Sequence, residues 1–155
     1  MRVGVLSDTH GILRPQVLER LAGCELLLHA GDVGMAEGEA PILTRLARLA
    51  PVVAVRGNTD GGELAATLPA VQSGELAGMA YRMTHRREDV DPDWLLRAVR
   101  LIVFGHSHRP ELEWRGDRLL LNPGSCGARR FQLPLTVAVV TISGQRLVPE
   151  ILAVE

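Results

Sequence analysis

Short apolar runs, each followed by a polar loop that contains glycine, recur along the first part of the chain. The runs lie at residues 2–6, 25–29 and 52–55. The first alternates and the second is apolar on both faces, as in buried parallel strands. The segments that separate these runs, residues 15–22 and 39–49, have apolar residues at helical spacing. This order predicts a βαβαβ unit whose strands end at one edge of a parallel sheet.

The second half of the chain has a different pattern. Residues 72–84 alternate weakly around two glycines, which predicts antiparallel strands. A helix is expected from Asp91 or Asp93 to about Val99, followed by a buried strand at residues 101–104. Four further strands are predicted at residues 111–114, 118–121, 136–142 and 146–153. Two mixed sheets packed face to face, with helices outside, fit this order in a single α/β domain spanning residues 1–155.

The loops that follow these strands contain residues that can bind metal ions. They are Asp8-Thr9-His10-Gly11, Gly31-Asp32, Gly57-Asn58-Thr59-Asp60, Thr84-His85 and Gly105-His106-Ser107-His108. Taken singly, an Asp or Asn here would be a turn residue and the His pair a surface feature. Together they supply carboxylate, amide and imidazole groups that suit Mn, Fe, Zn or Ni. Two imidazoles two residues apart also favour a pair of ions over one.

In order and spacing, these residues resemble the calcineurin-like metallophosphoesterase superfamily, whose pattern is D-x-H, G-D, G-N-x-[DE], H and G-H-x-H. The likeness is greatest to its small, cap-less bacterial and archaeal phosphodiesterases, and it extends from Asp8 to Asn122-Pro123-Gly124-Ser125. It implies a four-layer α-β-β-α sandwich of two mixed sheets. It also implies two divalent metal ions, with Mn²⁺ expected and Ni²⁺, Fe²⁺, Co²⁺ or Zn²⁺ as alternatives. The implied ligands are Asp8, His10, Asp32, Asn58, His85, His106 and His108.

The resemblance divides the ligands into two sets that share Asp32. One set is Asp8, His10, Asp32 and His108, and the other is Asp32, Asn58, His85 and His106. Two ions about 3.5–4 Å apart can hold a hydroxide between them, orient the phosphorus and neutralise charge on its oxygens. Attack by this bridging hydroxide would require neither a nucleophilic side chain nor a separate general base.

Four neighbouring residues receive more specific hypotheses. Asp60, which we group with Asn58 as catalytic, is expected to orient a neighbouring group, with a solvated turn residue as the alternative. Arg86 stands where the family usually has Gly, and it could bind substrate phosphate, crowd the entrance or be a plain solvated charge. Thr59 stands where protein phosphatases have a leaving-group His, although its hydroxyl is too weak an acid for that role. His29 is expected to be hydrogen-bonded near the site without binding metal.

The composition of the chain limits which binding partners and which cellular location are expected. The net charge of −1 gives no electrostatic basis for nonspecific nucleic-acid binding, so nucleic acid is not an expected partner. All 17 basic residues are Arg, which excludes a P-loop lysine and Schiff-base chemistry. Cys24 and Cys126 lie far apart and form no C-x-x-C pair, and Cys24 is expected in the core. With no signal-like or long apolar segment, a cytoplasmic protein with no membrane association is expected, and a homo-oligomer is left open.

These observations lead to one principal functional hypothesis. It is a dinuclear metal-dependent phosphodiesterase that acts on a small or nucleotide-derived phosphoester. A nucleotide or dinucleoside-polyphosphate phosphatase is the alternative within the same chemistry, and a nuclease is disfavoured by the short chain and its lack of a basic surface. A scaffold that binds proteins, like the retromer subunit of similar fold, is the alternative from another class. Such a scaffold would have no need of all seven ligands.

Overall fold

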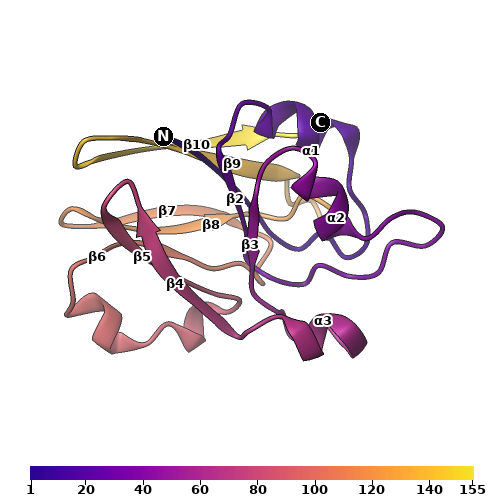
Figure 1. Ribbon diagram of the computed structural model, residues 1–155, viewed down its shortest axis with the longest axis horizontal. Coiled ribbons are helices and arrows are strands. Elements are labelled where there is room, and N and C mark those ends of the chain that lie inside the picture. The colour runs from indigo at the N-terminus through magenta and orange to yellow at the C-terminus, as the bar shows by residue number, and fades with distance from the viewer.

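Two mixed sheets of five strands each, packed face to face, form the centre of the computed structural model, which describes residues 1–155 (Figure 1). The first sheet has the order β10-β9-β1-β2-β3. Its strands are β1 (Arg2–Leu6), β2 (Leu26–His29), β3 (Val52–Ala54), β9 (Thr136–Ser143) and β10 (Arg146–Ala153). Strands β1, β2 and β3 are parallel, as the βαβαβ prediction required. Strand β9 pairs antiparallel with β1, and β10 pairs antiparallel with β9 at the edge of the sheet.

The second sheet has the order β4-β5-β6-β8-β7. Its strands are β4 (Val71–Leu76), β5 (Met79–Thr84), β6 (Val99–Val103), β7 (Pro110–Arg115) and β8 (Arg118–Pro123). Strands β5, β6 and β8 are parallel, whereas β4 and β7 are antiparallel edge strands. The two-sheet prediction is therefore confirmed, including the strands that form hairpins at Ala77-Gly78 and Gly116-Asp117.

The space between the sheets is filled by aliphatic side chains. These side chains come from one face of each sheet. Examples are Val3 and Val5 of β1 and Leu101 and Val103 of β6, each at most 1 % exposed. Full burial of such a side chain contributes roughly 1.5–3 kcal/mol relative to leaving it exposed. Tyr81 is the one aromatic residue among the 17 in this core. The core is therefore held together by close packing of aliphatic side chains and not by aromatic stacking.

The outer faces of the two sheets are covered unequally. Helices α1 (Pro15–Leu21) and α2 (Ile42–Ala47) bury an apolar face against the first sheet, in a cluster that also contains Cys24. The second sheet is covered by two short 3₁₀ helices, η1 (Arg87–Asp89) and η2 (Pro92–Leu95), with Trp94 packed on Ile102 and Leu120. Helix α3 (Gly62–Thr67) lies to one side (Figure 1). No helix has the length and apolar character needed to cross a membrane.

The structure corrects two helix predictions and adds one helix that was not predicted. The helix expected over 39–49 begins only at Ile42, because Pro41 precedes it in an extended conformation. The helix expected up to Val99 is wrong: it is the 3₁₀ turn η2, Ala98 is exposed and Val99 already belongs to β6. Helix α3 was not predicted, because it buries no residue and so leaves no apolar periodicity in the sequence.

Candidate metal centre

Loops from both sheets bring six of the predicted ligands into two groups. Asp8, His10 and His108 form one group, and Asp32, His85 and His106 form the other. Within each group the candidate ligand atoms all lie within 4.8 Å of one another. The two carboxylates follow β1 and β2 of the first sheet, and His85, His106 and His108 follow β5 and β6 of the second.

Both carboxylates reach across the boundary between the groups. The Oδ2 atom of Asp32 lies 3.2 Å from His85 Nε2 and 3.7 Å from His10 Nε2. The Oδ1 atom of Asp8 lies 3.3 Å from His108 Nε2, 3.6 Å from His10 Nε2 and 4.0 Å from His85 Nε2. The two groups therefore form one continuous cluster of ligand atoms rather than two separate sites.

The cluster contains buried polar atoms that no protein group satisfies. Of six such side-chain atoms in the chain, five belong to these residues: Asp8 Oδ1, His10 Nε2, His85 Nε2 and both ring nitrogens of His108. An unsatisfied buried polar atom costs about 1–3 kcal/mol, so five in one place need a common explanation. Carboxylate oxygens and imidazole nitrogens that converge in this way fit divalent cations. His85 is already oriented for this, because Nδ1–H donates to the Ala30 carbonyl at 2.6 Å and leaves Nε2 free.

The electrostatics of the cluster favour ionised carboxylates. Burial alone would raise the pKa of Asp8, but the nearby imidazoles of His10 and His108 and the hydrogen bond donated by Ser7 outweigh it and hold the pKa well below its usual range. For Asp32, burial is likewise outweighed, by His85 and by the Thr59 backbone, and the pKa falls to about 2. Burial would lower the pKa of His85, but its contacts with Asp32 and the Ala30 carbonyl raise it.

Five ligand residues have a backbone conformation that L-amino acids rarely adopt. Their φ angles are positive: Asp8 58°, His10 46°, Asp32 52°, His106 71° and His108 62°. Outside this set, only Ala77 and Phe131 among the non-glycine residues share the feature. The left-handed conformation costs a non-glycine residue roughly 1–2 kcal/mol. Strain of this kind gathers where side chains must be aimed at a common point.

The Asn122-Pro123-Gly124-Ser125 loop supports the cluster through its hydrogen bonds. Asn122 Nδ2 donates to the Gly105 carbonyl and to Ser107 Oγ, both at 3.0 Å. Ser125 Oγ donates to the Asp8 carbonyl at 3.1 Å. The loop therefore fastens the His106–His108 turn to the loop after β1.

Ser7 is a supporting residue that the sequence did not reveal. Its hydroxyl donates to Asp8 Oδ2 at 2.6 Å, and a Cβ on Gly105 would lie only 2.1 Å from that hydroxyl. In the sequence, only its position directly before Asp8 distinguishes Ser7 from other serines at strand ends. Gly105 is required here by the closeness of the two loops.

His29 lies behind the cluster, hydrogen-bonded as expected. The Gly31 N–H donates to its Nδ1 at 3.2 Å, so Nε2 carries the proton and donates to Thr9 Oγ1 at 3.0 Å. The Thr9 hydroxyl in turn donates to the Val33 carbonyl at 2.7 Å. Complete burial lowers the pKa of His29 to about 4, so the ring is neutral at pH 7. This chain of hydrogen bonds holds Thr9, which sits between Asp8 and His10.

The remaining predicted residues lie around the cluster. The Asp60 carboxylate accepts backbone N–H groups from Gly57 at 2.8 Å, Gly34 at 3.0 Å and Val33 at 3.2 Å, and so ties the loops after β2 and β3 together. Asn58 is exposed and is not hydrogen-bonded through its side chain, although it lines a pocket with His85. Thr59 is exposed as well, and its N–H donates to Asp32 Oδ1 at 2.9 Å.

Two consecutive arginines after His85 have different environments. Arg87 pairs with Glu111 and Glu113, each at 2.6 Å, and its guanidinium lies over the Phe104 ring. Arg86 is half-buried and has neither an ion pair nor a hydrogen bond through its side chain. Arg86 therefore remains available to an external anion, and Arg87 does not.

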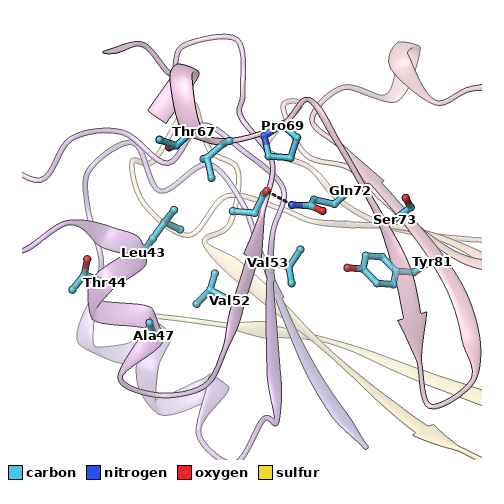
Figure 2. A pocket seen from close by; sticks show the side chains of 12 residues that line it. Leu43, Thr44, Ala47, Val52, Val53, Thr67, Pro69, Gln72, Ser73 and Tyr81 are labelled. Atoms are coloured by element: carbon cyan, nitrogen blue, oxygen red, sulfur yellow. Dashed lines mark hydrogen bonds between the residues drawn. The ribbon is translucent and has the colours of Figure 1, made fainter. Parts of the chain in front are cut away.

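The largest hollow of the molecule lies elsewhere. It has a volume of about 630 Å³ and runs along β3 between α2 and β4, where Figure 2 shows Val52, Val53 and Tyr81 around it. Gln72 Nε2 donates to the Ala54 carbonyl at its border, at 3.4 Å. None of the predicted site residues lines this hollow, so its size alone does not mark the functional site.

Comparison with known proteins gives a family match and named relatives. A family profile described as "Calcineurin-like phosphoesterase superfamily domain" matches residues 1–145. A probable metallophosphoesterase of Methanothermobacter thermautotrophicus is 33% identical over 167 residues, which cover 98% of this chain and 92% of that protein. The phosphodiesterase YfcE of Escherichia coli K12 is 29% identical, with 97% of both chains covered.

Solved structures show the same fold. The structure of a novel archaeal phosphodiesterase superposes with a TM-score of 0.79 at 22% identity and covers 98% of this chain and 100% of that one. Vps29 of Entamoeba histolytica, solved in complex with Zn²⁺, superposes with a TM-score of 0.72 at 21% identity and covers 100% of both chains.

Proposed function

Because this chain belongs to the calcineurin-like phosphoesterase superfamily and is a metal-dependent phosphoesterase, we propose that it hydrolyses small or nucleotide-derived phosphodiesters at a dinuclear metal centre. One observation carries the proposal. Two groups of three ligand residues meet, and five of their buried donor and acceptor atoms have no protein partner. A single ion would use only one group.

The residues that would hold the two ions follow from this arrangement. Asp8, His10 and His108 would hold one ion and His85 and His106 the other, with Asp32 shared because Oδ2 faces both groups. We assign the exposed amide of Asn58 to the second set, since it borders the same pocket as His85. Manganese is our proposed ion, because the donor set mixes hard oxygens with imidazoles. When bound, such ions neutralise charge on phosphoryl oxygens and activate water.

The chain's own residues prepare the site for this chemistry. Asp8 and Asp32 have lowered pKa values, so both carboxylates remain ionised at neutral pH and attract cations. Neither Ser7 nor Cys126 is available as a nucleophile: Ser7 donates to Asp8, and burial raises the pKa of Cys126 to about 12. These features support direct attack by water rather than a covalent phosphoenzyme.

Two further residues act around the reacting group in this proposal. Asp60 is a positioning residue, because its carboxylate holds the backbone of the loops that carry Asp32 and Asn58. Arg86 would contact a phosphate oxygen of the substrate through its unpaired guanidinium. With a net charge of −1, the chain suits a small-molecule phosphoester better than a nucleic acid.

The proposal is tested by metal removal and reloading. Protein dialysed against chelator should lose hydrolysis of bis-p-nitrophenyl phosphate, and Mn²⁺ should restore it together with two ions per chain by elemental analysis. Undiminished turnover in excess chelator would overturn the dinuclear mechanism. A fully metal-loaded protein that cleaves no phosphoester would instead support a scaffold, the role that we considered from the likeness to the retromer subunit.

A further inference from the structure

A small polar pocket adjoins the metal centre on the side of Asn58 and His85. Its volume is about 210 Å³, and one of its eight lining residues is apolar. At about 30 Å³ for each water molecule, this is room for roughly seven waters. The pocket therefore accepts a phosphate-sized group but not a whole nucleotide, and a group bound there would lie next to one bound at the metal ions.

Two guanidinium groups line this pocket. Arg86 has no partner, as described above, and is half-buried. Arg56 is held in place through Nη1–H, which donates to the Leu68 carbonyl at 2.9 Å, and its other side-chain nitrogens have no protein partner. The one acidic residue of the pocket is Asp89, which pairs with neither arginine. The pocket thus carries an excess of positive charge.

The surroundings of His10 carry the reverse charge. A hollow of about 440 Å³ beside His10 is lined by Glu37 and Glu39, and Glu39 pairs with Arg45. Glu37 is exposed and makes no ion pair. An anionic substituent of the substrate would consequently be repelled on the His10 side and attracted on the His85 side.

We propose that the pocket lined by Arg56 and Arg86 binds a second phosphate of the substrate, so that the preferred substrates are phosphoanhydrides, in which the reacting phosphate is linked through oxygen to another phosphate. The inference rests on the proposed phosphoesterase function. Guanidinium groups bind phosphate through paired N–H donors, and two of them match the charge of a terminal phosphate.

This substrate class also accounts for the absence of an acid at Thr59. Water adds its oxygen to the phosphorus at the metal centre, and the bond from that phosphorus to the bridging oxygen breaks. The distal phosphate leaves with the bonding electron pair as a stable anion, which Arg56 and Arg86 neutralise, while the proton from water passes to solvent. No side chain has to protonate the leaving oxygen, whereas an alkyl ester would need such help.

The test compares two substrates across three variants. The metal-loaded enzyme is assayed on bis-p-nitrophenyl phosphate, which has a single anion, and on adenosine diphosphate, in which the reacting phosphate is linked through oxygen to a terminal phosphate. Arg56→Gln and Arg86→Gln should each lower kcat/KM for the diphosphate about 10- to 100-fold, the range expected for lost hydrogen bonds between charged groups. Arg56→Gln should leave the single-anion diester nearly unchanged, and Arg86→Gln should affect that diester much less than the diphosphate. Arg87→Gln removes one charge from the adjacent residue and should leave the ratio of the two activities unaltered.

A binding measurement separates the pocket from catalysis. Calorimetric titration of inorganic phosphate into chelator-treated protein should show weaker binding in the Arg56→Gln and Arg86→Gln variants but not in Arg87→Gln. An equal fall on both substrates, or no fall on either, would overturn the inference and leave the phosphoesterase function intact. A metal-loaded wild type that cleaves neither substrate would overturn the function itself, and the phosphate titration would still decide whether the pocket binds anions. Thermal unfolding of each variant shows whether it is folded.

Discussion

Asp32 Oδ2 lies 3.2 Å from His85 Nε2, with both side chains buried and the other carboxylate oxygen occupied by the Thr59 N–H. The same Oδ2 atom lies 3.7 Å from His10 Nε2, in the other group of ligands. The hydrogen bond to Oδ1 thus fixes the carboxylate so that Oδ2 serves both groups. This relationship makes Asp32 the residue whose replacement is expected to affect both metal ions.

We expect Asp32→Asn to lower metal occupancy at both positions and to reduce the rate at least ~100-fold, since even the loss of groups behind the ligands reaches that scale. His10→Ala should be milder and should remove about one ion. Metal content per chain and kcat, measured together, test this. Asp117→Asn, at an 81% exposed position in the turn between β7 and β8, is the matched control. Two tightly bound ions and near-normal turnover in Asp32→Asn would show that the shared position is wrong.

For Asp60→Asn we expect metal affinity to fall about 10- to 100-fold, because the amide replaces a carboxylate that accepts three backbone N–H groups. The amide NH₂ would face one of these donors, so urea unfolding should also show a loss of about 1–3 kcal/mol. Metal titration followed by kcat at saturating metal distinguishes positioning from chemistry. A large fall in kcat with unchanged metal affinity would mean that Asp60 acts on the substrate.

The exposed hydroxyl of Thr59 cannot serve as an acid at neutral pH, so rates should depend steeply on the pKa of the leaving group. Activated aryl diesters should be cleaved well and alkyl esters poorly, and Thr59→His should recover part of a general-acid effect of roughly 10²–10⁴-fold. The measurement is kcat/KM across substituted aryl phosphodiesters. A flat dependence with rate-limiting chemistry would point to another proton donor, with His10 or His106 the next to be tested.

Neutral His29 predicts a pH dependence of the metal-free protein. Its pKa is about 4 when folded and 6.5 in its ordinary state, so the unfolded chain binds more protons between these values. The free energy of unfolding should therefore fall as pH decreases from about 6.5 to 4. Urea unfolding at several pH values should show a shallower fall in His29→Gln. The lowered pKa of Asp32 acts in a separate window, between 3.8 and about 2. Parallel curves for the two proteins would contradict the assignment.

The left-handed backbone at His106 can be tested without metal. At φ 71°, a glycine should be more stable than an alanine, so His106→Gly should exceed His106→Ala by about 1–2 kcal/mol in the free energy of unfolding. At the neighbouring Ser107, whose φ is not positive, the order should reverse, because glycine loses more chain entropy. Chemical unfolding of the four chelator-treated variants provides the comparison. Equal stability of the two His106 variants would show that the backbone relaxes.

The sequence could predict that these polar residues gather in one place, because each follows an apolar run that forms a strand. In Gly31-Asp32 and Gly105-His106, a glycine that allows close approach of the backbone and a polar residue follow directly after a strand. These features are local, so they can be recognised without knowing how the sheets pack. The resemblance then supplied the grouping around Asp32. What the sequence could not provide was the direction of each side chain.

The features that went unpredicted depend on contacts between distant segments. The hydrogen bond from Ser7 to Asp8 and the position of Arg56 beside Arg86 exist only after the two sheets have packed. The helix expected after Asp91 failed for a related reason. Trp94, Leu95 and Ala98 have helical spacing, but Pro92 and the recruitment of Val99 into β6 leave room for only one 3₁₀ turn.

The division of the ligands between two sheets has a consequence for how the protein is made. During synthesis, Asp8 and Asp32 emerge early, but β1 acquires its partner β9 only after residue 136, and the histidines of the second sheet come from the middle of the chain. A ribosome-bound chain would present isolated carboxylates with weak, unselective affinity for cations. In the proposed dinuclear centre, selective metal binding would therefore begin only after both sheets have formed, late in synthesis.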